Sequence, residues 1–441
     1  MDIMPLDDFT VFKNFRLRDN VGLHTVEFTA CVTKSTFHNI YCKMYNYMSK
    51  VHAIDPSRFD NLDRYPTINP FDENCIFRQH SGCYPYISIT YGIRVELSHS
   101  DEFAHIKFIV DPVLYMDSRK KEFNPDEYDY FKITQCDYLF LKKFLNTFFA
   151  FLSKWNVPDF VIKRLKTTRV DFCVNISILG RFNLKKYFQY MRILPKYTRF
   201  NDKNKYVKIE DENKSIDTGD TCQCFRMNKY ENMVKFGNNS HTITMYDKVA
   251  EQLNHFNRKF RNIKLLRIEY QPENQKIKTI AENVISNGYL DDKIDRRYNT
   301  NPFGHSLLDE LWFLSFIAPY VILDAINTVF PSATIRSRTA ALKRISKIEC
   351  GKKTKNAMYE FVDIMSNSTS HSDMQNKIKS FKSMYGDSCY YRVINLLEAN
   401  NIAPIYMTDD DIRMLGFATL PSVRDIFLSA IKNDLDENKL D

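Results

Sequence analysis

The chain has 441 residues, of which 62 are Lys or Arg and 54 are Asp or Glu, so its net charge is +8. With 44% hydrophobic and 14% aromatic residues it is too apolar for a disordered chain, and only 11 glycines argue against a glycine-patterned repeat or a dinucleotide-binding enzyme. The length is typical of two or three domains. The small positive excess permits a nucleic-acid or anionic-membrane partner without establishing either.

The ten cysteines are scattered, and none forms a Cys-x-x-Cys pair. The N-terminal sequence MDIMPLDDF lacks the basic and apolar regions of a secretory signal, so we expect free thiols and a cytoplasmic protein. Residues 311–330 form an apolar stretch long enough to cross a bilayer, but Pro319, Asp324 and Asn327 interrupt it. We therefore expect a buried core helix or helix pair there, and no membrane partner.

The periodicity of apolar residues changes along the chain. Residues 1 to about 120 show strand-like alternation. Residues 137–154 repeat apolar side chains at three-to-four spacing, which predicts an amphipathic helix. Alternation returns at 168–176 and predicts a strand, whereas residues 201–232 are polar and charge-rich and predict a long loop or a solvated hairpin.

Two more strands are predicted at 241–246 and 265–270, and a helical pattern from Val249 to Phe260 follows the first of them. From about residue 275 to the end, the pattern is almost entirely helical.

These patterns predict an α+β fold with an antiparallel sheet, followed by a mostly α-helical C-terminal domain. The turn-rich segment Asn299–Gly304 marks the predicted boundary. We therefore predict an α+β domain over residues 1–298 and a helical domain over 299–441.

The three later strands place polar side chains together on one face, because side chains alternate along a strand. The residues expected on this face are Arg169, Asp171, Asn175, Tyr246, Arg267 and Glu269. Carboxylates can hold a divalent cation, arginines can bind phosphate, and a tyrosine hydroxyl can act as a nucleophile. The same residues could instead form ordinary cross-strand ion pairs, and Lys248 with Glu251 could be a helix-surface pair. Periodicity alone leaves both interpretations open.

Three short segments occur in a recognisable order: TRVD at 168–171, YDKVAE at 246–251 and LRIE at 266–269. Together they resemble the filamentous-phage gene II/gene X replication initiators, phage and plasmid proteins that start rolling-circle DNA synthesis. The likeness continues in LDELWFLSF at 308–316 and in residues 388–402, and it covers the chain discontinuously from about 85 to 430. Each motif is short, so the order and spacing carry the resemblance.

The resemblance implies a relaxase-like nuclease domain that nicks one strand at an origin through a covalent 5′-phosphotyrosine. The nick frees a 3′-OH for the polymerase, and the displaced strand is later rejoined into a circle. The resemblance implies Tyr246 as the nucleophile and Lys248 as its catalytic helper, within the motif that ends at Glu251. It also implies Mg²⁺ or Mn²⁺ held by Asp171 and Glu269. The implied partners are single- or double-stranded origin DNA and the host replication helicase and polymerase, with an oligomer at the origin.

The third metal ligand departs from the family pattern. Lys107 stands where the similar strand of the family has a Glu, and the chain contains no His-x-His pair. His105, on the same strand face as Lys107, or else Glu96 could replace that ligand. A lone His on a strand is more often structural than a ligand.

Residues 333–357 form a basic stretch in which Glu349 is the single acidic residue. Its basic residues are Arg336, Arg338, Lys343, Arg344, Lys347, Lys352, Lys353 and Lys355. Leu342, Ile345 and Ile348 fall on one helix face, which leaves the basic side chains on the solvent side, where they could contact phosphates. The candidate DNA-binding residues are therefore Arg169, Arg267, Arg336, Lys343, Arg344 and Lys347. A solvated helix without a DNA partner is the alternative interpretation.

Two functions compete with a nicking enzyme. One is a non-catalytic DNA-binding protein, such as a copy-control repressor of a phage or plasmid. The other is a structural phage or viral interaction protein whose aromatic strands only pack.

Overall fold

The structure is a computed structural model of the whole chain. It describes residues 15–18, 21–52, 83–88, 92–99, 104–124, 128–179, 182–194, 233–237, 241–251, 264–272, 274–286, 306–369, 371–415 and 419–437. The segment 201–232, the end of the helical pattern after Glu251 and the predicted boundary at 299–304 lie outside these residues.

The chain divides into two compact units, both of which are discontinuous in sequence. Unit 1 comprises residues 1–20, 174–270 and 321–441, and unit 2 comprises 21–173 and 271–320. Both units are α+β, and the large sheet is antiparallel in every strand pair whose register is described.

The sheet of unit 2 has the strand order β3-β4-β5-β2-β6. Its strands are β2 (Gly22–Val32), β3 (Cys83–Ser88), β4 (Ile93–His99), β5 (Ala104–Val110) and the first part of β6 (Lys166–Ile178). Its helices are α2 (Lys34–His52), α4 (Pro112–Asp117), α5 (Tyr138–Lys154), α6 (Asp159–Ile162), α9 (Asn274–Ser286) and the first part of α11 (Leu307–Val329). The strand β6 confirms the alternation predicted at 168–176.

Helix α5 begins as the sequence predicts, because the Asp137 carboxylate accepts hydrogen bonds from the amides of Leu139 and Phe140. Its apolar stripe packs on one face of the sheet, where the Phe148 ring lies 5.6 Å from Phe28 on β2 and 5.5 Å from Phe108 on β5, measured between ring centroids. Since side chains alternate along a strand, the neighbours of these two phenylalanines point to the opposite face. That opposite face of unit 2 is polar.

Helix α2 contradicts the strand-like prediction for residues 1 to about 120. The side chains of Phe37, Ile40 and Tyr41 are buried at three-to-four spacing, and the Thr33 hydroxyl accepts a hydrogen bond from the Thr36 amide at the start of the helix. The segment is rich in aromatic residues, which lower helix propensity. Tertiary packing of one helix face outweighs that local preference.

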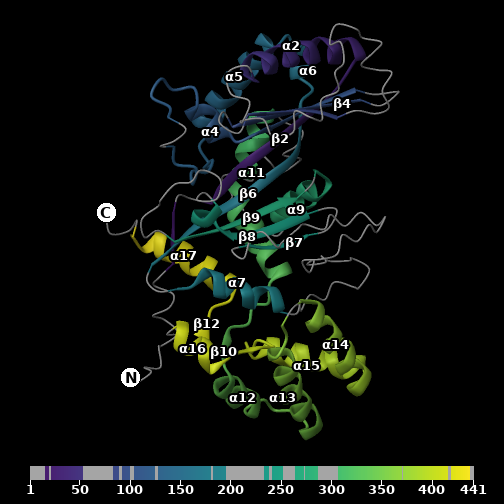
Figure 1. Cartoon of the computed structure of the whole chain (residues 1–441), viewed down its shortest axis with the longest axis vertical. Coiled ribbons are helices and arrows are strands. Elements are labelled where there is room, and N and C mark those ends of the chain that lie inside the picture. The colour runs from purple at the N-terminus through teal and green to yellow at the C-terminus, as the bar shows by residue number, and fades with distance from the viewer. Residues whose placement is uncertain are drawn as a thin grey trace. The chain divides into compact units, whose positions relative to one another are not determined.

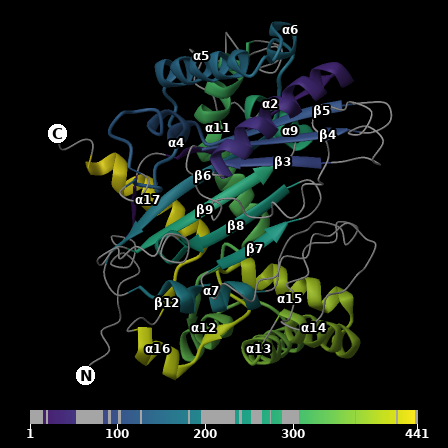
Figure 2. The same ribbon diagram turned by 45° about the horizontal axis from the view of Figure 1, so that its top comes forward.

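The sheet of unit 1 has the order β6-β9-β8-β7 (Figure 2). The strand β1 also pairs with the end of β6. Its other strands are β1 (Phe15–Leu17), β7 (Met233–Gly237), β8 (His241–Asp247) and β9 (Leu265–Pro272). Strands β8 and β9 confirm the two later strand predictions. Helix α7 (Leu184–Ile193) contacts β7 and β8 and also contacts α14 (His371–Tyr385), so it lies between this sheet and the C-terminal helices (Figure 1).

The C-terminal part of unit 1 is mostly helical, as predicted. Besides α14 it contains α12 (Arg338–Ser346), α13 (Lys352–Ser366), α15 (Asp387–Ala399), α16 (Asp409–Leu415) and α17 (Val423–Glu437). The Phe361 ring on α13 lies 4.9 Å from Phe381 on α14 and 5.8 Å from Tyr390 on α15, so aromatic packing joins these three helices. The sequence did not predict the small sheet β11-β10-β12, formed by Ile335–Ser337 (β10), Tyr406–Met407 (β11) and Thr419–Leu420 (β12).

Helix α11 is the apolar stretch considered as a membrane span. It is the one described helix that is long and apolar enough to cross a membrane. The side chains of Leu314, Ile317 and Ile322 are nevertheless fully buried within the protein. The predicted buried core helix is therefore confirmed, as a single helix.

Candidate functional site

Tyr246 lies near the end of β8 in unit 1, beside a carboxylate of the neighbouring strand. Its hydroxyl donates a hydrogen bond of 2.8 Å to Oε1 of Glu269 on β9. The Tyr246 side chain is packed into the fold, with an exposed fraction of 7% for the residue. The structure thus brings the predicted nucleophile and one predicted carboxylate into direct contact.

Arg267 links Glu269 to β6. The Arg267 Nε donates to Oδ1 of Asn175 at 2.7 Å, and its Nη1 lies 3.5 Å from Oε1 of Glu269. The exposed fraction of Arg267 is 0%. The prediction of an open polar face is therefore wrong for this residue: its side chain is buried, and its contacts with Asn175 and Glu269 satisfy the guanidinium there. Its guanidinium holds Asn175 and Glu269 in place, and it does not face solvent where a phosphate could reach it.

Lys248 starts the helical turn that follows Tyr246, and its exposed fraction is only 4%. Its Nζ lies 2.7 Å from Oε2 of Glu251 and 5.7 Å from the centroid of the Tyr246 ring. Burial and the positive charge of Arg267 lower the pKa of Lys248, although Glu251 and Glu269 oppose that shift. A lysine with a lowered pKa can supply a neutral amine that accepts a proton.

The start of this helical turn is capped by Asp247. Its Oδ1 accepts hydrogen bonds from the amides of Val249 and Ala250, at 3.0 and 3.1 Å. Free amides at a helix N-terminus could stabilise a Tyr246 phenolate. Both amides are bonded to Asp247 instead, so they are already occupied.

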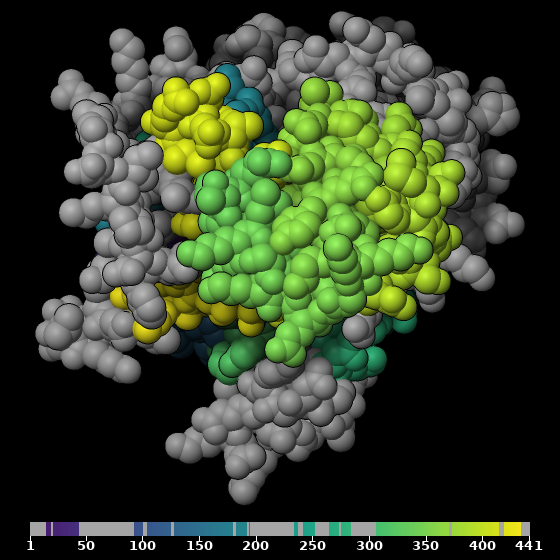
Figure 3. All heavy atoms as spheres, turned by 90° about the horizontal axis from the view of Figure 1, so that it is seen from below, coloured from purple at the N-terminus to yellow at the C-terminus, as the bar shows by residue number. Residues whose placement is uncertain are grey.

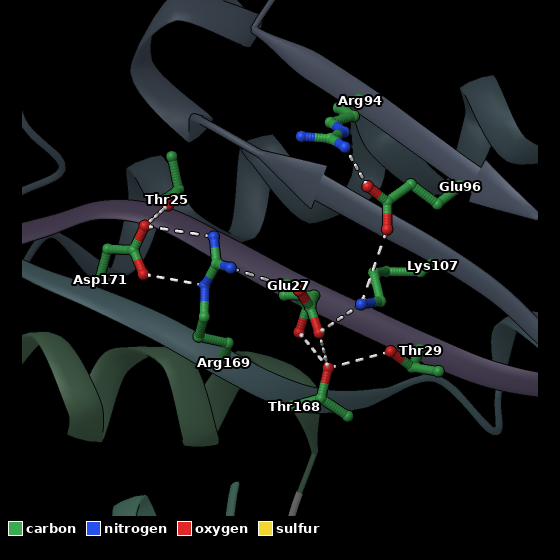
Figure 4. A network of polar contacts seen from close by, with 9 residues as sticks. All are labelled: Thr25, Glu27, Thr29, Arg94, Glu96, Lys107, Thr168, Arg169 and Asp171. Carbon is green, nitrogen blue, oxygen red and sulfur yellow. Dashed lines mark hydrogen bonds and ion pairs between the residues drawn. The ribbon is translucent and has the colours of Figure 1, made fainter. Parts of the chain in front are cut away.

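A second polar cluster lies on the face of the unit 2 sheet opposite α5 (Figure 4). Charges of opposite sign alternate across the four strands β4, β5, β2 and β6, with threonines between them. The chain of ion pairs runs from Arg94 to Glu96, Lys107, Glu27, Arg169 and Asp171. Lys107 Nζ lies 3.6 Å from carboxylate oxygens of both Glu27 and Glu96, and Arg169 Nε lies 3.0 Å from Oδ1 of Asp171.

Arg169 is held on both sides by carboxylates. Burial alone would lower the pKa of the Arg169 guanidinium, but Asp171 and Glu27 raise it above its ordinary value. The hydroxyl of Thr25 also donates to Asp171. Arg169 therefore forms a cross-strand ion pair in the structure. The sequence had left this pair open as the alternative to a phosphate-binding role.

Glu27 was missed by sequence reasoning. In its strand it lies between Val26 and Phe28, both buried, so alternation alone could have placed it on the polar face. Its position opposite Arg169 comes from the register between β2 and β6. That register joins segments far apart in sequence, which no local pattern specifies.

The predicted metal ligands are distributed over both units. Asp171 lies in unit 2 and Glu269 in unit 1, and each of these carboxylates is paired with an arginine. His105 lies on β5 opposite Cys31 and Ser98. Among the residues that the structure describes, no three His, Cys, Asp or Glu side chains gather closely enough to hold a metal ion. The dependence on Mg²⁺ or Mn²⁺ stays a prediction.

The basic stretch of the C-terminal region contains one buried member. Arg336 on β10 has an exposed fraction of 6%, and its Nη1 donates to the carbonyl oxygens of Asn401 at 2.6 Å and Thr334 at 3.1 Å. The expectation that Arg336 faces solvent is therefore wrong, because it ties β10 to the turn that follows α15. Lys343, Arg344 and Lys347 are exposed on and just after α12, as predicted.

The sequence matches no model of a known protein family and no curated protein.

Proposed function

We propose that this chain is a rolling-circle DNA replication initiator that nicks one strand of an origin and later rejoins it. The observation that carries the proposal is the hydrogen bond from Tyr246 to Glu269, with Lys248 buried beside it. A tyrosine that donates to a carboxylate and lies near a lysine of lowered pKa has the groups that an activated nucleophile needs. The order of the motifs around these same residues, which resembles the gene II/gene X initiators, supports the proposal independently.

The chemistry needs a base because tyrosine ordinarily titrates near pH 10. In the proposed reaction the Tyr246 proton passes to Glu269 and from it to the neutral amine of Lys248, which is the final base, and the phenol oxygen forms a bond to the scissile phosphorus. The bond from phosphorus to the 3′-oxygen breaks, and that oxygen takes a proton from water. The product is a 5′-phosphotyrosine and a free 3′-OH from which a polymerase can extend. The reverse transfer to a 3′-OH rejoins the strand without ATP, because the covalent link keeps the bond energy.

A divalent cation, when bound, would polarise the scissile phosphate. Each step above uses protein groups and water alone. The resemblance implies Asp171 and Glu269 as carboxylates for such a cation; they belong to different compact units, so each is tested by its own variant.

The test is incubation with supercoiled origin DNA in Mg²⁺ or Mn²⁺. Wild-type protein should give open circles and a covalent protein–DNA adduct, and Tyr246→Phe should give neither while retaining DNA affinity. Tyr190→Phe is the matched control, since Tyr190 is also buried and its hydroxyl also donates to a carboxylate, that of Asp411. Nicking by Tyr246→Phe, or equal loss in both variants, would contradict the proposal. Asp171→Ala and Glu269→Ala should each abolish nicking and spare affinity.

The burial of Tyr246 favours a second function, a non-catalytic DNA-binding protein. In that case the Tyr246–Glu269–Arg267 cluster is a structural network that stabilises unit 1, and the exposed basic residues near α12 supply the affinity. The same assay separates the two, because such a protein shifts DNA in a salt-sensitive way and leaves supercoiled DNA uncut.

A further inference from the structure

Five exposed cations surround the turn between α12 and α13. They are Lys343, Arg344, Lys347, Lys352 and Lys353, and we call them the basic turn. The side chains of Ile345 and Ile348 are buried beneath them, which fixes the segment and leaves the charged side chains outside. The surface of α12 and α13, drawn in green, faces the viewer in Figure 3.

Among the described residues, none balances the positive charge of the basic turn through a side-chain contact. None of the five side chains forms a hydrogen bond or an ion pair with another described residue, and Glu349 is the one acid between residues 343 and 353. The neighbouring cations are engaged elsewhere: Arg338 pairs with Asp363, and Lys355 donates to the carbonyl oxygen of Ser346. Within the described part of the chain, nothing occupies the five charges of the basic turn.

Part of this charge suits the fold, because Lys343 and Arg344 lie in the last turn of α12 and Lys347 caps it, where the helix dipole favours cations. The charge at the start of α13 does not. Lys352 and Lys353 lie in the first turn of α13, which has no acidic residue, although the helix dipole disfavours cations at that end. A polyanionic partner explains why Lys352 and Lys353 stand at an end of α13 that disfavours them.

The composition of the surface selects among polyanions. No large apolar side chain is exposed on α12 or α13, so the surface has nothing to insert into a bilayer. Residues 338–355 contain no Phe, Tyr or Trp, so it has no ring on which an unpaired base could stack. What remains is contact with a regular row of phosphates, as a duplex presents them.

We propose that the basic turn binds the phosphate backbone of double-stranded DNA without regard to base sequence. This inference rests on the proposed function in taking DNA as the polyanion, and it adds the duplex as the bound form. It also adds Lys352 and Lys353 to the candidate DNA-binding residues and removes Arg336 from them. The basic turn then supplies affinity, while the Tyr246 cluster supplies chemistry.

The experiment compares two variants of the full chain that lose the same charge. In the first, all five residues of the basic turn are replaced by Gln. In the second, the control, five exposed lysines of unit 2 are replaced by Gln: Lys142, Lys143, Lys154, Lys163 and Lys166. Binding to a short duplex of unrelated sequence and to one of its single strands is measured by fluorescence anisotropy over a range of salt concentrations, without divalent metal. Circular dichroism confirms that both variants are folded.

Each phosphate contact adds about 0.9 to the slope of log affinity against log salt on a duplex, so losing all five lowers the slope by up to about 4.5. At about 0.1 M salt each contact contributes roughly tenfold, so loss of two or more weakens duplex binding by about a hundredfold or more. The control should stay within about threefold of wild type, because distant charges are screened.

Equal effects of the two variants would overturn the proposal, since general charge would then explain the affinity. A variant that loses single-strand binding but keeps duplex binding would also overturn it. The proposal would also be overturned if the five-residue variant lost binding to phosphatidylserine vesicles while its binding to the duplex stayed unchanged. Because the assay needs no cleavage, a chain that binds through the basic turn and never nicks would keep this inference and refute the proposed enzyme.

Discussion

The buried guanidinium of Arg267 leads to a prediction that is independent of function. We expect Arg267→Met to destabilise the protein strongly. Methionine fills much of the same volume, but Asn175 loses the donor at 2.7 Å and the buried carboxylate of Glu269 loses its neighbouring positive charge. Breaking a buried ion pair from one side costs about 3–5 kcal/mol, because an unpaired charge stays behind in a poorly solvated place.

The expected loss of about 3–5 kcal/mol is large compared with the whole free energy of unfolding of a protein. The free energy of unfolding of a typical protein is about 5–15 kcal/mol, so Arg267→Met removes a third or more of it in most of that range. The double variant Arg267→Met/Glu269→Gln should recover part of the loss, since glutamine carries no charge to leave unpaired. The two substitutions are therefore expected to be non-additive.

The assay is urea unfolding followed by circular dichroism, with Arg344→Met as the matched control. Arg344 is exposed on α12, and its replacement should change the free energy of unfolding by about 0.5 kcal/mol or less. A cost below about 1 kcal/mol for Arg267→Met, or a double variant that loses the sum of the two single effects, would refute the reasoning. Either result would mean that Glu269 is not held by Arg267 as a charged pair.

Two further predictions concern titration. Burial raises the pKa of Glu310 to about 7 from 4.5, so the folded state binds more protons than the unfolded state between these values. The free energy of unfolding should therefore fall by up to about 3 kcal/mol as the pH rises through this interval. Urea titrations at several pH values should show that Glu310→Gln removes this fall. An equal fall in the variant would contradict the assignment to Glu310. The lowered pKa of Lys248 predicts that adduct formation speeds up as the pH rises through a value below the ordinary 10.5, because only the neutral amine accepts a proton. Lys248→Met should lack this rise, and a pH profile identical to wild type would exclude Lys248 as the base.

The sequence determined the local elements whose signals are short-range. The apolar repeat over residues 137–154 predicted α5, and alternation predicted β6, β8 and β9, because helix and strand periods act within a few residues. The same alternation predicted Tyr246 and Glu269 on one face of the sheet, and the structure shows that their strands are neighbours. It failed for α2, where aromatic residues hid a helix that tertiary packing stabilises.

Only the tertiary structure decided which of these side chains are covered and with whom they pair. Arg336 and Lys343 belong to one basic stretch, yet the first is buried against the carbonyl oxygen of Asn401 and the second is exposed. Likewise Glu27 meets Arg169 through strand register alone. The physical reason is that a local pattern shows only to which face of its own helix or strand a side chain points. Desolvation and charge pairing depend on segments that are distant in sequence, and these segments contact the side chain only when the chain folds.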